Sequence, residues 1–314
     1  MKGIAILLMV IGHVVARQFT NYQIALNDFP RSAMFLFRFI YSFHMPLLMF
    51  CSGLFALRIK DYTLKNIGNI VWKRVMRLLF PFFAAGTLKY YILGDDSYFW
   101  FLWVLFIFIM IVIFIDGLCS LLPKYQQNVS SALIIISALL VQIFHGKYAC
   151  FGQLPFLDLW HTNMYPYFCM GVICARYDLC TKWFSKNWVY TISLLVFGFL
   201  TYLITIKGFH VLPKQSWTGC LLPISAIVML VYLFKEGLSE DTKPVVWLQN
   251  LGRHSLEIYI IHIFFCLRMP FIGNYIKGLA SAGDGVTIFF IQTVTSFVMS
   301  IVIIYLSYIV MNVY

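Results

Sequence analysis

The sequence predicts an all-α protein, a polytopic transmembrane helical bundle, and two observations lead to this fold class. Of its 314 residues, 61% are hydrophobic and 18% are aromatic, whereas 11% are charged. Soluble proteins carry about 25% charged residues, so this chain has too few to cover a water-exposed surface. Its apolar residues also run in segments near the length of about 20 residues that one helical span needs.

Apolar segments bounded by charged or turn residues predict ten spans, and we expect the whole chain, 1–314, to form one integral membrane domain. The first span follows Lys2, the second stops at Arg58 and the third follows Arg74. In chain order the predicted spans are 3–20, 34–57, 75–93, 98–118, 130–145, 163–177, 187–206, 217–235, 254–271 and 285–311. The sequence shows no internal repeat of the kind from which many transporters are built.

The basic residues predict the orientation, because short cytosolic loops are enriched in Lys and Arg. The loop after the second span carries Arg58, Lys60, Lys65, Lys73, Arg74 and Arg77. With this loop in the cytosol, fourteen basic residues fall inside and seven outside. We therefore expect both termini in the cytosol and a multi-pass protein of the cytoplasmic (inner) membrane. The net charge of +11 follows the ends of the spans, which indicates the lipid bilayer as partner and argues against nucleic acid.

Three histidines fall at membrane depth in three different spans. His13 lies about 16 Å above Lys2, His44 about 21 Å above Arg58, and His262 about 13 Å above Arg253. In a hydrocarbon core about 30 Å thick, all three share one level. Ionisable side chains there suggest function, because burying a charged one costs roughly 3 kcal/mol. The pattern indicates proton transfer inside the membrane.

No residue spacing predicts a metal site. The eight cysteines are scattered, mostly in or beside apolar segments, and form no Cys-x-x-Cys pattern. We interpret them as small buried apolar residues.

Several runs together resemble the integral membrane acyltransferase-3 family, whose members O-acylate polysaccharides and related glycans. They are Lys2-Gly3-Ile4-Ala5-Ile6-Leu7 ending at Gly12-His13, Ser42-Phe43-His44-Met45-Pro46-Leu47 with Ser52-Gly53, Lys73-Arg74-Val75-Met76-Arg77-Leu78-Leu79-Phe80-Pro81, Trp100-Phe101-Leu102-Trp103, and Ser255-Leu256-Glu257-Ile258-Tyr259-Ile260-Ile261-His262. These runs follow the family order across nearly the whole chain. Family members usually carry an acidic residue before the first run, whereas this sequence begins at Met1-Lys2.

The resemblance implies an O-acetyltransferase that takes an acyl group from acyl-CoA, with acetyl-CoA the expected donor, on the cytosolic side. The implied acceptor is a hydroxyl of a glycan or lipid-linked sugar at or beyond the outer face. The family's basic-x10-His pattern corresponds to Lys2 and His13, and its Arg-x-x-Arg pattern to Arg74 and Arg77.

His13 is the predicted general base. Acyl transfer from a thioester to an alcohol needs a group that takes the hydroxyl proton, and a neutral imidazole, with an ordinary pKa near 6.5, suits this task. A covalent acyl-histidine and a histidine that only bonds a neighbouring helix remain alternatives.

His44 is the second catalytic candidate. It precedes Met45-Pro46, and a proline inside a helix frees a backbone carbonyl one turn back. His44 either satisfies such a carbonyl, or it orients the acceptor, donates to the thioester carbonyl or holds one tautomer of His13. An exchange of roles with His13 also stays open.

The donor's nucleotide is predicted to bind at Arg74 and Arg77, with help from Lys73 and Lys2. Guanidinium groups match phosphate geometry, and coenzyme A carries phosphate groups. The alternative is ordinary anchoring at the cytosolic membrane face.

Glu257, the third catalytic candidate, lies about 6 Å above Arg253 and is not predicted to share a helix face with His262. It pairs with another helix or faces a water-filled cavity. By contrast, Ser255, Tyr259 and His262 form one stripe, and we expect Tyr259 and His262 to line a substrate tunnel.

Arg38 and Trp100 complete the predicted substrate site. Arg38 either snorkels to the outer interface or contacts an anionic acceptor, and Trp100 either belongs to an interfacial belt or contacts substrate. Acceptor contacts are also expected from residues 146–162 and 207–216.

The competing function is a membrane exporter or flippase of a glycan or lipid. Both classes need polar residues at the midplane. The Arg74/Arg77 pair favours the enzyme, because an exporter has no need of a cytosolic nucleotide site. The sequence predicts no oligomeric state.

Overall fold

The fold is described from a computed structural model of the chain. The structure describes residues 1–20, 35–56, 63–94, 99–122, 124–144, 159–207, 217–239, 241–266 and 270–312. Six basic residues used for the orientation or the spans lie outside these ranges: Arg31, Arg58, Lys60, Lys147, Lys214 and Arg268. Most of the two loops expected to contact the acceptor, 146–162 and 207–216, also lies outside them.

The predicted all-α class is confirmed, since every regular element in the described ranges is a helix. Six helices are long and apolar enough to cross a membrane: Phe35–Leu54, Trp100–Cys119, Gln126–Phe144, Asn187–Lys207, Gly219–Gly237 and Gly285–Met311. Two shorter apolar helices, Lys2–Ala16 and Ser255–Phe265, lie in the first and ninth predicted spans. Helical residues occur at every predicted span, while the count of ten and the cytosolic termini stay predictions.

The chain forms two compact units. Unit 1 comprises Met1–Leu48, Trp183–Pro213 and Thr218–Tyr314, and unit 2 comprises Met49–Lys182 and Lys214–Trp217. The expectation of one integral membrane domain over 1–314 stays a prediction.

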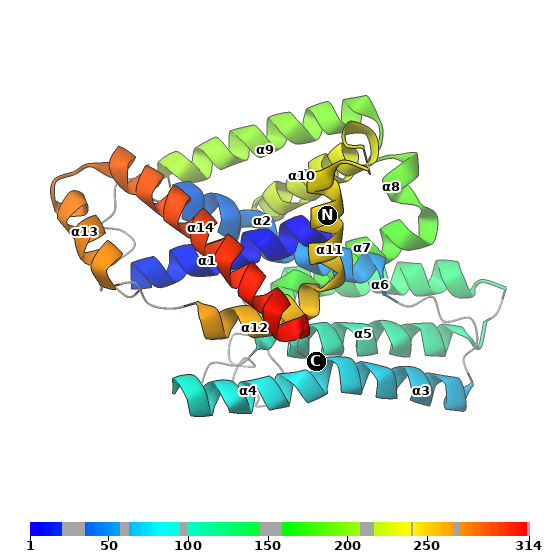
Figure 1. Cartoon of the computed structure of the whole chain (residues 1–314). Helices are drawn as coiled ribbons and strands as arrows, with labels where there is room; N and C mark the ends of the chain where they lie inside the picture. The colour runs from blue at the N-terminus through cyan, green and yellow to red at the C-terminus, as the bar shows by residue number, and fades with distance from the viewer. Residues whose placement is uncertain are drawn as a thin grey trace. The chain divides into compact units, whose positions relative to one another are not determined.

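Unit 1 is built around the first helix of the chain. Helix α1 (Lys2–Thr20) packs against α11 (Lys243–Arg253), α12 (Ser255–Phe265) and α14 (Gly285–Asn312), as Figure 1 shows. The other helical elements of this unit are most of α2 (Phe35–Leu54), α9 (Asn187–Lys207), α10 (Trp217–Tyr232), the π-helix η5 (Leu233–Gly237) and α13 (Pro270–Ser281). Helices that are distant in sequence therefore surround α1.

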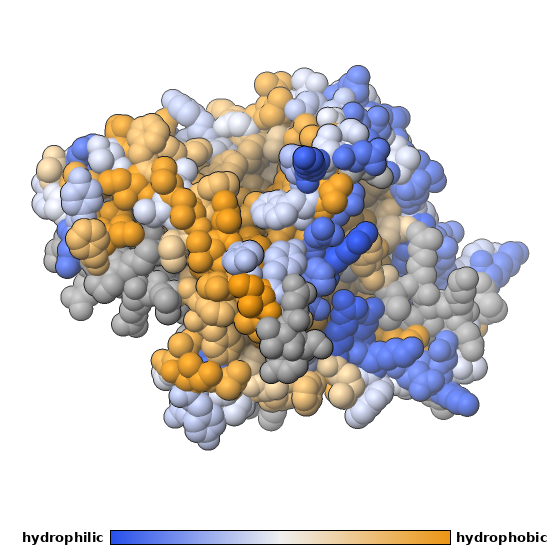
Figure 2. Space-filling view, in the orientation of Figure 1, coloured by the Kyte–Doolittle hydropathy of each residue, from blue (hydrophilic) through white to orange (hydrophobic). Residues whose placement is uncertain are grey.

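Helix α14 has an apolar outer side and buries four polar side chains among apolar ones. Its outward residues include Val286, Phe290 and Tyr305, each more than half exposed, and the surface over α14 is largely apolar in Figure 2. Its buried side carries Gln292, Ser296, Ser300 and Ser307, all with no exposed surface. This polarity is typical of a helix in lipid, where small polar residues allow close packing against other helices.

Two glycines bring α1 and α11 into backbone contact. A Cβ atom at Gly3 would overlap the carbonyl oxygen of Leu248, and one at Gly252 would lie 3.2 Å from the Gly3 nitrogen. A larger residue at position 3 would therefore push the two helices apart. This contact explains why glycine follows Lys2 in the first family-like run.

Unit 2 contains the middle of the chain. It comprises the end of α2, a long helical stretch of α3 (Leu64–Arg74), η1 (Val75–Leu79) and α4 (Phe80–Leu93), then α5 (Trp100–Cys119), α6 (Gln126–Phe144), η3 (Leu159–Met164), α7 (Tyr165–Tyr177) and α8 (Leu179–Lys182). Helix α6 packs against both α5 and α7, and η1 packs against α5. The predicted third span therefore begins with one turn of π-helix, a local irregularity that is frequent at functional sites.

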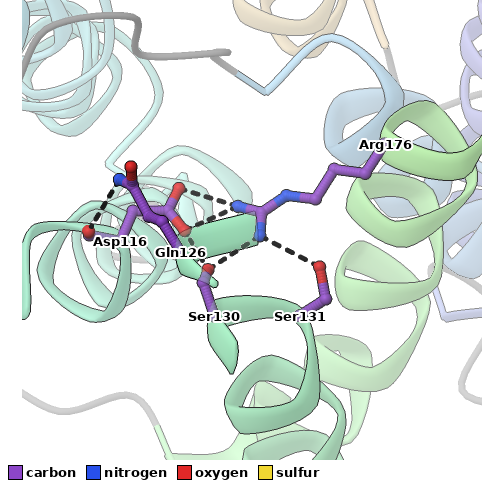
Figure 3. Close-up of polar contacts among 5 residues, drawn as sticks. All are labelled: Asp116, Gln126, Ser130, Ser131 and Arg176. Carbon is purple, nitrogen blue, oxygen red and sulfur yellow. Dashed lines mark hydrogen bonds and ion pairs between the residues drawn. The ribbon is translucent and has the colours of Figure 1, made fainter. Parts of the chain in front are cut away.

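A buried ion pair joins the ends of α5, α6 and α7. Arg176 on α7 contacts both carboxylate oxygens of Asp116 on α5 at 2.7 Å, and it donates to Ser130 and Ser131 on α6. Ser130 also donates to Asp116. Figure 3 shows the guanidinium group facing the carboxylate and both hydroxyls. Because the bonds satisfy both charges, these three helix ends are locked together.

Candidate functional site

The centre of the candidate site is a pair of imidazole rings from α1 and α12 in unit 1. Nδ1 of His13 lies 2.7 Å from Nε2 of His262. The ring centroids are 5.0 Å apart and the planes differ by 15°. The centroid separation exceeds the distance between the nitrogens by about two ring radii, so the rings meet edge to edge. The geometry is that of an N–H···N hydrogen bond, a contact that the shared depth of the two residues did not by itself predict.

The sequence around His262 directs its ring toward α1. Ser255, Tyr259 and His262 are all buried, which confirms that they share one stripe of α12. The rings of Tyr259 and His262 are 6.0 Å apart, and Nδ1 of His262 lies 3.1 Å from the carbonyl oxygen of Ile258. This contact with its own helix orients the ring. His262 is almost completely buried, whereas His13 is half-buried.

Glu257 lies on a different side of α12 from His262. It is exposed on the surface, while His262 is 1% exposed. The prediction that these two residues do not share a helix face is confirmed. The structure therefore leaves the Glu257 carboxylate on the outside of unit 1, and its catalytic role stays a prediction.

His44 is buried in α2 and contacts its own helix. Its Nδ1 lies 2.7 Å from the carbonyl oxygen of Ile40, so the ring nitrogen donates to this carbonyl. Pro46 lacks an N–H group for the carbonyl four residues earlier, that of Ser42. His44 therefore contacts a different carbonyl from the one that Pro46 frees.

Tyr41 connects the His44 region of α2 to α1, and sequence reasoning missed it. Its hydroxyl donates to the carbonyl oxygen of Gly12 at 3.4 Å, and its ring lies 4.9 Å from that of His44, at 72°. A Cβ atom at Gly12 would lie 3.0 Å from Ile40, so glycine allows α1 and α2 to approach there. The spacing of three residues between Tyr41 and His44 was the available signal, because such residues share a helix face.

Arg38 binds the end of α9. Its Nη1 donates to the carbonyl oxygens of Thr205 at 2.9 Å and Ile204 at 3.3 Å. A cation at a helix C-terminus is favourable, because the last carbonyls carry partial negative charge. The structure thus gives Arg38 a helix-capping contact that neither sequence alternative included, and contact with an anionic acceptor stays a prediction.

The basic cluster of the predicted donor site lies in unit 2 on α3 and η1. Lys73 and Arg77 are exposed and Arg74 is half-buried. Burial, followed by the positive charge of Arg77, lowers the pKa of the Arg74 guanidinium from its ordinary value. The two guanidinium groups therefore repel each other, and an anion bound to both would relieve this repulsion. Lys2, the fourth predicted donor-binding residue, is in unit 1, beside Gly252 at the end of α11.

Trp100 lies at the start of α5 and stacks on His161 of η3. The two ring centroids are 3.7 Å apart and the planes differ by 8°. Nearby in sequence, Asn163 is buried, and its Oδ1 has no hydrogen-bond partner among the described residues. His161 falls inside the loop expected to contact the acceptor, but its pairing with Trp100 could not be read from sequence, because about 60 residues separate them.

Within the described ranges, no three His, Cys, Asp or Glu side chains are grouped as metal ligands would be. In unit 1, the described imidazoles of His13 and His262 are in direct contact. Such a pair can accept, hold and pass a proton without a metal.

Comparison with known proteins gives one finding. Residues 1–309 match the model of a protein family described as an acyltransferase domain. No curated protein and no solved structure matches the chain significantly. The match covers both units.

Proposed function

The chain belongs to the acyltransferase-3 family of integral membrane acyltransferases, and from this premise we propose that it O-acetylates a sugar. The donor is acyl-CoA, with acetyl-CoA the expected form. The acceptor is a hydroxyl of an extracytoplasmic glycan or lipid-linked sugar. The protein acts in the cytoplasmic membrane, which it crosses several times.

One observation carries the choice of His13 as general base: its ring is held by a second imidazole at 2.7 Å. A base must be positioned as well as available, because general acid–base catalysis depends on hydrogen-bond geometry. His13 is half-buried and His262 is almost completely buried, so His262 supports the ring from inside the unit. Catalytic bases in other enzymes are likewise held in position by a second, orienting group.

In the proposed step, His13 takes the proton of the acceptor hydroxyl while the oxygen attacks the thioester carbonyl. The carbon–sulfur bond then breaks, and the CoA thiolate leaves. The proton on His13 passes to the thiolate, which restores the neutral imidazole. The products are the acetylated sugar and free CoA, so no further reactant is needed. Transfer through an acetyl group on His13 itself is the alternative route.

For the donor, we propose that Arg74 and Arg77 bind phosphate groups of coenzyme A, with Lys73 and Lys2 as further cations. Support comes from the mutual repulsion of the two guanidinium groups, which a bound phosphate offsets. Arg is suited to this role because its planar group makes two parallel hydrogen bonds to phosphate.

For the acceptor and the reacting carbonyl, the remaining candidates keep their predicted roles. His44 orients the hydroxyl or the thioester, supported by its burial in α2. Glu257 is a catalytic candidate because it belongs to the same family-like run as His262. Arg38, Trp100 and Tyr259 are the proposed substrate contacts, whereas His262, which was also predicted to contact substrate, is proposed to support His13. The stacking of Trp100 on His161 gives the Trp100 contact a rigid aromatic surface.

The test is transfer by purified protein in nanodiscs, with labelled acetyl-CoA and a panel of cell-envelope glycans. We expect His13→Gln, which keeps the size and polarity of the side chain, to lower transfer by roughly 10²-fold or more. His254→Gln, at an exposed histidine of the same unit, is the control and should transfer normally. Undiminished transfer by His13→Gln would remove the proposed base.

Two further measurements separate the alternatives. Label that stays on the protein after acid quenching of wild type, but not of His13→Gln, indicates the acetyl-histidine route. Movement of a glycan or lipid across liposomes without CoA, together with no acetyl transfer, indicates the exporter instead.

A further inference from the structure

We infer that His262 is a positioning residue that holds His13 in the tautomer with its lone pair on Nε2. This inference rests on the proposed role of His13 as base and assigns His262 a task other than contact with substrate. It names the atom that accepts the proton.

The contact of His262 with the backbone of its own helix determines which of its ring nitrogens carries the hydrogen. A carbonyl oxygen accepts hydrogen bonds and cannot donate one. Nδ1 of His262 lies 3.1 Å from the carbonyl oxygen of Ile258, so Nδ1 carries the hydrogen. A neutral imidazole has one N–H group and one lone pair. Nε2 of a neutral His262 is therefore the acceptor.

The tautomer of His262 in turn determines the tautomer of His13. Its Nδ1 lies 2.7 Å from Nε2 of His262, and one of these two nitrogens must donate. Since Nε2 of His262 is the acceptor, Nδ1 of His13 carries the hydrogen. The lone pair of a neutral His13 is then on Nε2, which makes Nε2 the nitrogen that takes the proton of the acceptor hydroxyl.

The backbone of α12 sets the donor-to-acceptor direction of these two hydrogen bonds. The hydrogen bonds run from His13 to His262 and from His262 to Ile258, and the last acceptor is a peptide carbonyl that cannot reverse its role. Burial of His262 keeps water from competing for either nitrogen. In a histidine, the hydrogen bond made by one ring nitrogen commonly determines whether the other nitrogen has the reactive lone pair.

The arrangement also assists the charged intermediate. When Nε2 of His13 takes a proton, the His13 ring becomes positive and its Nδ1–H bond to His262 becomes charge-assisted. Such bonds are roughly twice as strong as neutral ones. The stabilisation is therefore larger in the charged state than in the resting state, which is the condition for catalysis.

The first test reads the tautomer directly and needs no substrate. In ¹⁵N-histidine-labelled protein in nanodiscs, we expect Nδ1 of His13 to give a protonated-type resonance and Nε2 a lone-pair-type resonance. The His13 signals are identified by their loss in His13→Gln. A scalar coupling across the hydrogen bond should link Nδ1 of His13 to Nε2 of His262. A proton on Nε2 of His13, or the absence of this coupling, would overturn the inference.

Two substitutions at His262 then separate positioning from packing. His262→Gln can place an amide oxygen near the position of Nε2 and still accept from His13, whereas His262→Leu fills similar space without an acceptor. We expect His262→Leu to mix the His13 tautomers and His262→Gln to keep the wild-type one. Identical His13 spectra in wild type and His262→Leu would contradict the assignment, and His254→Gln is the control for loss of a histidine.

The second readout is thiol release from acetyl-CoA with water as acceptor. For His262→Leu we expect kcat to fall by roughly 10²-fold with KM for acetyl-CoA unchanged, and for His262→Gln we expect recovery to within a few-fold of wild type. Equal loss in both variants would show that an acceptor at this position is not what matters. If wild type neither releases thiol with water nor transfers acetyl to any glycan of the panel, the proposed function fails, while the spectra still decide the tautomer.

Discussion

Gly53 on α2 and Gly171 on α7 bring their helices into backbone contact within unit 2. A Cβ atom at Gly53 would overlap the carbonyl oxygen of Phe168, and one at Gly171 would overlap that of Phe50. Each glycine therefore faces the backbone of the opposite helix. Contacts of this kind are common between membrane helices, because small residues let two backbones approach closely.

Gly53→Ala should destabilise the protein because backbone atoms cannot move aside as a flexible side chain can. Overpacking of this kind costs about 1–3 kcal/mol. Gly86→Ala on α4 is the matched control, since a Cβ atom there meets nothing within 4 Å. Thermal unfolding in nanodiscs should show a lower midpoint for Gly53→Ala, with Gly86→Ala unchanged or higher. Equal midpoints for the two variants would show that α2 and α7 are not in contact at Gly53.

Asp116→Ala should destabilise unit 2 more than the removal of both charged partners. The side chains of Arg176 and Asp116 are 12% and 6% exposed, so loss of the carboxylate leaves a buried, uncompensated cation, which costs about 3–5 kcal/mol. In Asp116→Leu/Arg176→Met neither charge remains, and the loss of stability should be smaller. Thermal midpoints of both variants and of Arg176→Met measure this order. A double variant less stable than Asp116→Ala would contradict it.

Arg74→Gln should weaken the binding of acetyl-CoA. A hydrogen bond to a charged group is worth about 1.5–3 kcal/mol, so we expect KM to rise roughly 10- to 100-fold with little change in kcat. The effect should disappear with acetyl-pantetheine, a thioester donor that lacks the nucleotide. Lys65→Gln, at an exposed residue on α3, is the control. The same rise for both donors would argue against phosphate binding by Arg74.

Gln292→Leu should stabilise the protein. Gln292 on α14 is fully buried, and neither Nε2 nor Oε1 of its amide has a hydrogen-bond partner among the residues that the structure describes. A buried polar group without a partner costs about 1–3 kcal/mol. We therefore expect a higher thermal midpoint for Gln292→Leu and a lower one for Gln292→Glu, which buries a charge. A lower midpoint for Gln292→Leu would contradict this prediction, because it would show that the Gln292 amide makes a stabilising hydrogen bond in the membrane-embedded protein.

The fold class and the placement of a few candidate residues along and around single helices were accessible from the sequence, because the bilayer acts on composition and local periodicity. Few charged residues and long apolar runs predicted a helical membrane protein. Helical rise predicted that His13 and His262 lie at one depth, and helical rotation predicted that Glu257 and His262 point in different directions. Each of these depends on neighbours within one helix, where geometry is regular.

The partners across helices were decided by the tertiary structure. His13 and His262 are 249 residues apart in sequence, and no rule of helix geometry chooses His262 rather than His44 as the ring that His13 contacts. The same holds for Arg176 with Asp116 and for Trp100 with His161. Such contacts depend on which helices pack together and on how each is rotated about its axis. Packing of the whole chain sets these rotations, so a single helix does not contain them.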